Sequence, residues 1–189
     1  LTPDGNDYQV WVGSIYHQLL YEPYVLPSTA LIRRTAIAGH APFPVDNIHC
    51  GDWQFFAEMT KRAPCVFLAL PTVLNRSHDD EVRLTRKCPI IRTRDRLRLI
   101  DHVWLADKAF MENYRHEVDR IKAQQLAKLA LFCLYEDRRN EALGYLLRQR
   151  QLSESSRGIK DCLLYFGARL PFSPQLLRKL QRIKSMGRR

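Results

Sequence analysis

The stretch GDWQFFAEMTKRAP, residues 51–64, carries the clearest structural pattern in the chain. Trp53, Phe56 and Met59 recur at helical spacing, which predicts an amphipathic helix whose apolar face lies in a core. The proline that closes the stretch cannot continue a helix, so the helix is expected to end just before it. Asp52 stands at the start of this pattern, and two interpretations compete for it: a helix N-cap, or a catalytic carboxylate.

The segments on either side of this helix have a different character. The preceding segment, AGHAPFPVDNIHCG (38–51), is rich in glycine and proline and is typical of a loop. The following segment, CVFLALPTVLNRSH (65–78), predicts a strand that is interrupted at Pro71 and leads into a polar loop. We therefore expect an α/β fold class for the first part of the chain.

The pattern becomes helical after residue 92. A helix capped by Thr93 is predicted over residues 93–115, a second over 117–136 and a third over 138–152, with the last two forming a hairpin that turns at EDRRN. A final short helix is expected near the end of the chain. The predicted fold class is thus α/β, with a partial sheet, followed by an all-α helical tail.

Charge follows the same division. We expect one domain over residues 1–90 and a basic helical region over 91–189. Residues 1–79 hold five basic and seven acidic residues, a net charge of −2, whereas residues 80–189 hold 25 basic and 13 acidic residues, a net charge of +12. The positive part of the chain is expected to attract phosphate groups, on nucleic acid, lipid or nucleotides.

Composition narrows the class of protein. An apolar share of 46% and a charged share of 26% are ordinary for a globular protein, and no apolar run is long enough for a transmembrane helix. The first residues resemble no signal peptide and lack an initiator Met, so we expect a fragment of a longer protein. The odd cysteine count without C-x-x-C spacing predicts a reducing compartment and small buried thiols rather than disulfides or zinc ligands. The cysteines are Cys50, Cys65, Cys88, Cys133 and Cys162.

Three segments in register resemble the acceptor half of a family 2 glycosyltransferase with the GT-A fold. They are PSTALIRRTAIAG (27–39), GDWQFFAEMTKRAP (51–64) and VFLALPTVLNRSH (66–78). The first is similar to a small-residue strand followed by a helix, the second to the family's Glu-Asp-Trp helix, and the third to the strand and Arg-x-His loop that follow it. A helical tail behind such a domain is also common in bacterial members of this family.

The resemblance implies a reaction and a set of site residues. These enzymes transfer a sugar from a nucleotide-sugar donor to an acceptor hydroxyl, and the motif match makes Asp52 the general base. It also implies that Trp53 and Arg76 bind substrate and that His78 approaches a divalent metal, Mn²⁺ or Mg²⁺. From the residues alone, the default interpretation of Trp53 is a core residue and that of His78 an exposed loop histidine.

The chain departs from the family pattern in two ways. Gly51 replaces the glutamate that precedes the catalytic aspartate, which is expected to change how the start of the helix is held. No D-x-D motif is present, although in the family this motif is the main binding site of the metal. The resemblance therefore implies that the donor-binding half lies outside this chain, and it places the enzyme in the cytoplasm, on the inner face of the membrane, where glycan or lipid-linked acceptors of cell-surface polysaccharide are made.

A rival interpretation comes from the basic tail. Arginines alternate with other residues from Arg92 to Arg98, and residues 173–184 predict a basic amphipathic helix. Such a module could bind RNA or an anionic membrane surface without catalysis. Nucleic acid is the less favoured partner, because the sequence contains no RRM, KH, zinc-finger or helix-turn-helix signature. A plain solvated helical face also remains open.

Overall fold

The computed structural model describes residues 9–37, 43–44, 46–74 and 88–152, and in these ranges the protein is mainly helical. Strands β1 (Val10–Gly13) and β2 (Cys65–Leu68) form a two-stranded antiparallel sheet with Trp11 opposite Phe67. Three short helical segments lie between β1 and the longer helix α2 (Gly51–Arg62). They are η1 (Gln18–Leu20), η2 (Pro27–Thr29) and α1 (Arg34–Ile37).

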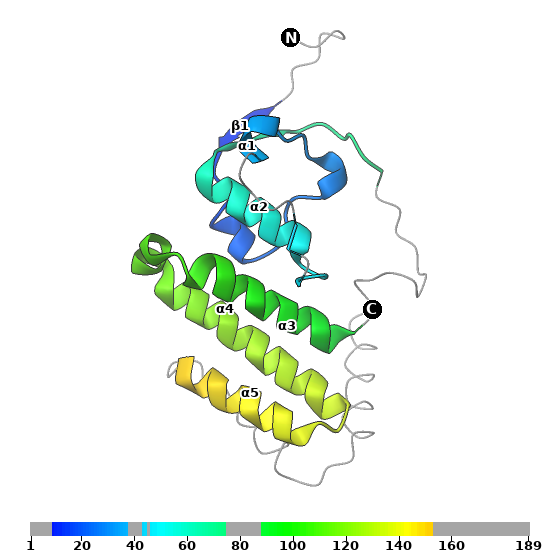
Figure 1. Cartoon of the computed structure of the whole chain (residues 1–189), viewed down its shortest axis with the longest axis vertical. Helices are drawn as coiled ribbons and strands as arrows, with labels where there is room; N and C mark the ends of the chain where they lie inside the picture. Colours follow the sequence, from blue (N-terminus) through cyan, green and yellow to red (C-terminus); the bar gives the residue numbers. More distant parts are fainter. Residues whose placement is uncertain (1–8, 38–42, 45, 75–87, 153–189) are drawn as a thin grey trace.

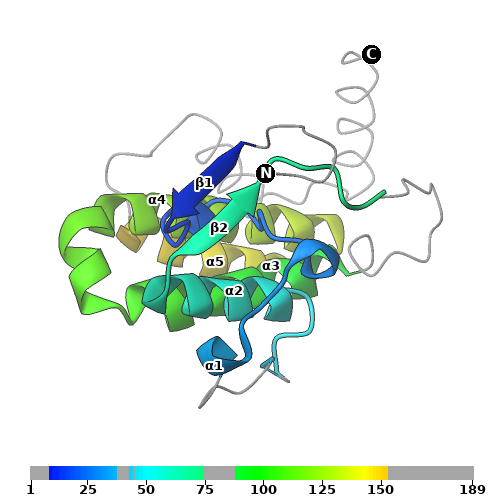
Figure 2. The ribbon, with the colours of Figure 1, turned by 90° about the horizontal axis from the view of Figure 1, so that it is seen from above.

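The second half of the described chain is an antiparallel array of long helices. Helix α3 (Pro89–Leu99) runs into a π-helical segment, η4 (Ile100–Leu105), and α4 (Lys108–Tyr135) then returns along α3. Helix α5 (Arg139–Leu152) packs on the other side of α4, so that α4 lies between α3 and α5 (Figure 1). Helix α2 and the strands lie on the far side of α3 (Figures 1 and 2).

The predicted fold class holds at a coarse level. The strands of the described residues lie before residue 90, and the described residues from 88 to 152 are helical, as expected for a helical tail. Within residues 27–39 a short strand or turn followed by a short helix is expected, and the described residues form a 3-10 turn and a one-turn helix, so the turn is correct and the strand is not. The sheet is a single two-stranded ribbon, so a GT-A sheet stays a proposal.

Helix α2 ends where predicted, but it begins earlier. Residue Cys50, with φ −132° and ψ 18°, occupies the N-cap position, and Gly51 is the first helical residue. The expectation that Asp52 is the N-cap is therefore wrong by two positions. Asp52 lies in the first turn, where its charge still faces the positive end of the helix dipole. The helix ends at Arg62, before Pro64, as predicted.

The expected cap at Thr93 is also wrong. Helix α3 begins four residues earlier, at Pro89. Proline suits the start of a helix because the N–H that it lacks would have no intrahelical partner at this position. Thr93 is buried inside the helix and donates its hydroxyl to the Pro89 carbonyl at 2.8 Å. The single helix predicted over residues 93–115 is divided, because Asp107 caps a new helix by accepting from the Phe110 N–H at 3.3 Å.

The predicted hairpin at EDRRN is confirmed. Asp137 adopts a left-handed conformation with φ 59° after the last residue of α4. The Arg138 N–H then donates to the Cys133 carbonyl at 2.8 Å, and the Asp137 N–H donates to the Leu134 carbonyl at 3.2 Å. This pair of bonds is a Schellman motif, which satisfies the open carbonyls at the end of α4 and turns the chain into α5.

The main core is shared by both halves of the described chain. Trp53 and Phe56 from α2 belong to the same buried cluster as Leu19, Leu99 and Trp104. A second cluster fills the space between α3, α4 and α5. The domain boundary expected near residue 90 therefore does not separate two independent cores in the described part of the chain. Among the described cysteines, all free thiols, Cys50 and Cys133 are buried, Cys65 is half-buried and Cys88 is exposed. The expectation of buried thiols is therefore confirmed for Cys50 and Cys133 and wrong for Cys88.

Asp107 joins three elements near this core. Its carboxylate accepts from the Tyr16 hydroxyl at 3.1 Å and lies 2.9 Å from Lys61 Nζ, in addition to capping α4 at Phe110. Burial favours the neutral acid, but the hydrogen bonds from Lys61, Phe110 and Tyr16 outweigh it and hold the pKa of Asp107 below its ordinary value of 3.8.

Within the described helices, none is long and apolar enough to cross a membrane.

The depressed pKa of Asp107 predicts acid sensitivity. Its stabilising contribution is complete above the ordinary pKa of 3.8 and is lost as the pH falls through the lower pKa of the folded state. We expect Asp107→Asn to lower the free energy of unfolding by about 1–2 kcal/mol at neutral pH and by less at pH 3. Urea unfolding of both proteins between pH 7 and pH 3 measures this difference. Parallel curves over that range would show that Asp107 titrates alike in the folded and unfolded states.

Candidate functional site

Asp52 lies at the surface end of a buried helix. Its neighbours Gly51 and Trp53 are buried, whereas Asp52 itself is partly exposed. One carboxylate oxygen, Oδ1, accepts from the Trp53 N–H at 2.7 Å, which satisfies one of the open donors of the first helical turn. In the part of the chain that the structure describes, Asp52 forms no ion pair. The arrangement leaves a partly exposed carboxylate that is held at one oxygen.

Trp53 fixes this helix to the rest of the molecule. Its side chain is 7% exposed, and its indole N–H donates to the Leu19 carbonyl at 2.6 Å. The guanidinium of Arg96 stacks over the indole ring at 4.8 Å from the ring centroid, which adds a cation–π contact. These contacts describe a core residue, and they leave little indole surface for an acceptor. That Trp53 binds substrate stays a prediction.

Arg96 is a partly buried cation at the junction of the two halves. It donates to the Tyr21 carbonyl at 2.5 Å, and burial lowers its pKa below the ordinary value. Its Nε lacks a hydrogen-bond partner among the described residues. Arg94, two residues earlier, pairs with Glu141 at 2.6 Å. These two arginines of the alternating series are therefore engaged within the fold, which weakens the argument for a basic ligand-binding stripe on α3.

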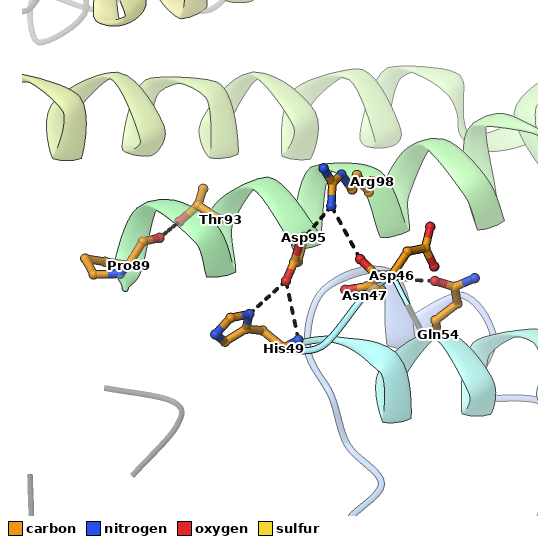
Figure 3. A network of polar contacts seen from close by, with 8 residues as sticks. All are labelled: Asp46, Asn47, His49, Gln54, Pro89, Thr93, Asp95 and Arg98. Atoms are coloured by element: carbon orange, nitrogen blue, oxygen red, sulfur yellow. Dashed lines mark hydrogen bonds and ion pairs between the residues drawn. The ribbon is translucent and has the colours of Figure 1, made fainter. Parts of the chain in front are cut away.

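The loop that leads to Asp52 is tied to α3 by a buried carboxylate (Figure 3). Asp95 Oδ2 accepts from His49 Nδ1 at 2.8 Å and from the His49 backbone N–H at 3.4 Å. Arg98 reaches the other Asp95 oxygen at 3.4 Å and the Asp46 carbonyl, also at 3.4 Å. The Asp95 side chain is 4% exposed, whereas that of Arg98 is 65% exposed, so the His49 contact is the better shielded one.

The same loop is also tied to α2. The Asn47 side-chain amide donates to Gln54 Oε1 at 3.1 Å, and both residues are buried. Gln54 in turn donates to Glu58 at 2.9 Å, one turn further along the helix. The loop from residue 46 to 50 is thus held between α2 and α3 immediately before Asp52 (Figure 3).

Sequence reasoning missed both His49 and Asp95. They are 46 positions apart, and only their meeting in the fold gives them a common role. One signal was present: Asp95 stands within a run of arginines, and its neighbours four positions away in each direction, Ile91 and Leu99, are apolar. A carboxylate on the buried side of a helix requires a partner, so this position could have been marked as one that pairs with a distant donor.

Cys50 is not a candidate nucleophile. It is 3% exposed, and burial, together with the nearby charge of Asp95, raises the pKa of its thiol to about 12. The thiol therefore stays protonated at physiological pH, when only a thiolate would be reactive. Cys50 acts here as a small buried residue that begins helix α2.

Two of the predicted site residues lie outside the described residues: Arg76, expected to bind substrate, and His78, expected to approach a metal. Both roles stay predictions. Among the described residues, no group of three or more His, Cys, Asp or Glu side chains is arranged to hold a metal ion. The divalent metal implied by the resemblance is accordingly a prediction about residues that are not described or not in this chain.

Comparisons with known proteins identify no relative of this chain. No family model matches the sequence, and neither curated proteins nor solved structures contain a significant match. The functional argument therefore rests on the residues and on their arrangement.

Proposed function

We propose that this chain is the acceptor-side part of a glycosyltransferase that moves a sugar from a nucleotide-sugar donor to an acceptor hydroxyl. The observation that carries the proposal is the position of Asp52. A partly exposed carboxylate stands on the first turn of a helix that is otherwise buried, at the end of a loop held on both sides. The same residue is the one that the sequence resemblance marks as the general base.

The chemistry requires a carboxylate at such a position. The acceptor oxygen forms a bond to the anomeric carbon as the bond from that carbon to the nucleoside diphosphate breaks. The diphosphate leaves with the bonding electron pair, and Asp52 takes the proton of the acceptor hydroxyl. A positioned base of this kind contributes about 10²–10⁴-fold to the rate. The implied metal would assist the leaving diphosphate, and the described residues offer no site for it.

The β-ribbon gives separate support for a larger sheet. Trp11 and Phe67 project from one face and are 44% and 62% exposed, whereas Val12 and Val66 on the other face are 63% and 62% exposed. Both faces of this antiparallel ribbon are thus apolar, whereas an antiparallel sheet with one face in water shows polar residues on that face. The ribbon therefore fits the proposal that the two strands form part of an α/β sheet, as in a GT-A domain.

The proposal is tested by assaying the full-length protein for turnover of nucleotide sugars. We expect release of nucleoside diphosphate from one member of a panel of UDP-, GDP- and dTDP-sugars with Mn²⁺ or Mg²⁺, stimulated by a saccharide or glycolipid acceptor. The Asp52→Asn protein is the matched control, because it keeps the side-chain oxygen that accepts from Trp53. Absence of acceptor-stimulated release across the whole panel would contradict the proposal.

A further inference from the structure

The carboxylate of Asp95 determines how the His49 ring is held. An ionised carboxylate can only accept hydrogen bonds, so His49 Nδ1, at 2.8 Å from Asp95 Oδ2, must carry the proton of this bond. In the neutral ring the other nitrogen, Nε2, then has no proton. The His49 side chain is 13% exposed, and the part of the chain that is described supplies no further hydrogen bond to its ring.

His49, which Asp95 holds, lies just before the start of the helix that carries Asp52. His49 precedes the N-cap residue of α2 by one position, and Asp52 follows that residue by two. Asp95 belongs to α3, which runs beside α2. Asp95 also accepts from the His49 backbone N–H, so it holds the main chain as well as the ring. A displacement of His49 would therefore change where helix α2 starts and where its first turn points.

We propose that Asp95 is a positioning residue for Asp52, and that it acts by holding the backbone and imidazole of His49 against helix α3. This inference rests on the proposed function, because it assigns Asp95 to the orientation of the general base. Arg98 supports the pair from the solvent side through Asp95 Oδ1 and the Asp46 carbonyl. Proton transfer needs the base within hydrogen-bond reach of the acceptor hydroxyl, and a misplacement of about 1 Å can lower a rate by about 10²-fold.

A positioning role differs from a chemical role for His49 itself. If Nε2 took part in the reaction, every replacement of the ring would abolish turnover. If His49 acts only through Nδ1, a side chain that places an N–H donor near that atom should recover the function. Asparagine does this, since its amide nitrogen lies at about the same distance from the backbone as Nδ1, whereas phenylalanine keeps the ring shape and supplies no donor.

The test uses four variants of the full-length protein: Asp95→Asn, His49→Phe, His49→Asn and the control Asp101→Asn. Asp101 lies six residues after Asp95 and pairs with the buried Lys122, so its replacement also breaks an ion pair of a buried group, but away from the loop. Acceptor-dependent kcat, acceptor and donor KM, and the free energy of unfolding in urea are measured for each, with the nucleotide sugar and acceptor selected from the panel above.

We expect Asp95→Asn and His49→Phe to lower the acceptor-dependent kcat by about 10-fold or more while the donor KM stays within about twofold. His49→Asn should recover most of this loss. Asp101→Asn should lower the free energy of unfolding without lowering kcat under conditions in which the protein is folded. Loss of turnover in His49→Asn equal to that in His49→Phe would overturn the proposal, because it would assign chemistry to Nε2. Unchanged kcat in both Asp95→Asn and His49→Phe would overturn it as well.

The outcome for Asp52 separates the two proposals. If Asp52→Asn abolishes transfer while Asp95→Asn and His49→Phe do not affect it, the proposed function stands and the positioning role of Asp95 is wrong. If Asp52→Asn leaves transfer unchanged, the assignment of the base is wrong, and the positioning role falls with it. Should Asp95→Asn fail to fold, His49→Phe, which retains the buried carboxylate, still gives a result on its own.

Discussion

Asp52→Asn is expected to lower the rate of sugar transfer by the full-length protein by at least about 10²-fold, the lower end of the effect of a general base. Donor affinity should stay nearly unchanged, because this carboxylate acts on the acceptor hydroxyl. The Trp53 backbone nitrogen lies 2.7 Å from Asp52 Oδ1. Asparagine has nearly the same shape as aspartate and keeps an oxygen that can accept from this N–H. The substitution therefore removes proton acceptance while leaving the start of helix α2 intact.

The matched control for this experiment is Glu58→Gln. Glu58 lies on the same helix and accepts from Gln54 at 2.9 Å, a bond that glutamine can also accept through its carbonyl oxygen. Initial transfer rates and donor dissociation constants are measured for both variants beside urea unfolding. Unchanged turnover in Asp52→Asn would return Asp52 to a role at the helix start alone. Loss of turnover together with an equal loss of folding stability would lead to the same conclusion.

Trp104→Ala is expected to have the largest effect on stability in the described chain, a loss of about 3–5 kcal/mol. The Trp104 side chain is 0% exposed and its ring stacks on Tyr16 with centroids 5.9 Å apart. Its indole N–H donates to the Tyr16 carbonyl at 3.2 Å. Truncation therefore leaves both a cavity and a buried carbonyl without its donor. Because domains are stable by about 5–15 kcal/mol, this one change removes a large part of the total.

Urea unfolding followed by circular dichroism measures this loss. The neighbouring Leu105→Ala is the control, because Leu105 is 38% exposed in the same helical segment and should lose far less than Trp104. Trp104→Phe should fall between the two, since it keeps most of the ring and removes only the indole N–H. Equal losses for Trp104→Ala and Leu105→Ala would show that the π-helical segment is not packed as the structure places it.

Local patterns were sufficient to predict most of the helices. The spacing of Trp53, Phe56 and Met59 placed α2, and the proline at position 64 marked its end. The EDRRN turn was also readable, because a polar run between two helical patterns predicts a reversal of the chain. These features depend on side chains that are near one another in sequence, and propensity and periodicity act at that range.

The exact starts of helices were not predictable from the same patterns. Asp52 and Thr93 both have the chemistry of an N-cap, yet the helices begin before them, at Gly51 and Pro89. In each case packing decides the matter. Residue Cys50 is buried at the start of α2, and Thr93 is buried within α3, where its hydroxyl turns back to the Pro89 carbonyl. A capping preference of about 1 kcal/mol is smaller than the gain from burying apolar residues of the helix in a core.

The sequence by itself determined that α2 is an amphipathic helix, that Asp52 stands at its positive end, and that long helices follow it. Only the tertiary structure decided that the loop before Asp52 is held by Asp95, and that Arg96 lies partly buried over Trp53. The physical reason is range. A helical period specifies which face is apolar, but it carries no information about which distant donor will meet a buried carboxylate, since that depends on how α2 and α3 pack in three dimensions.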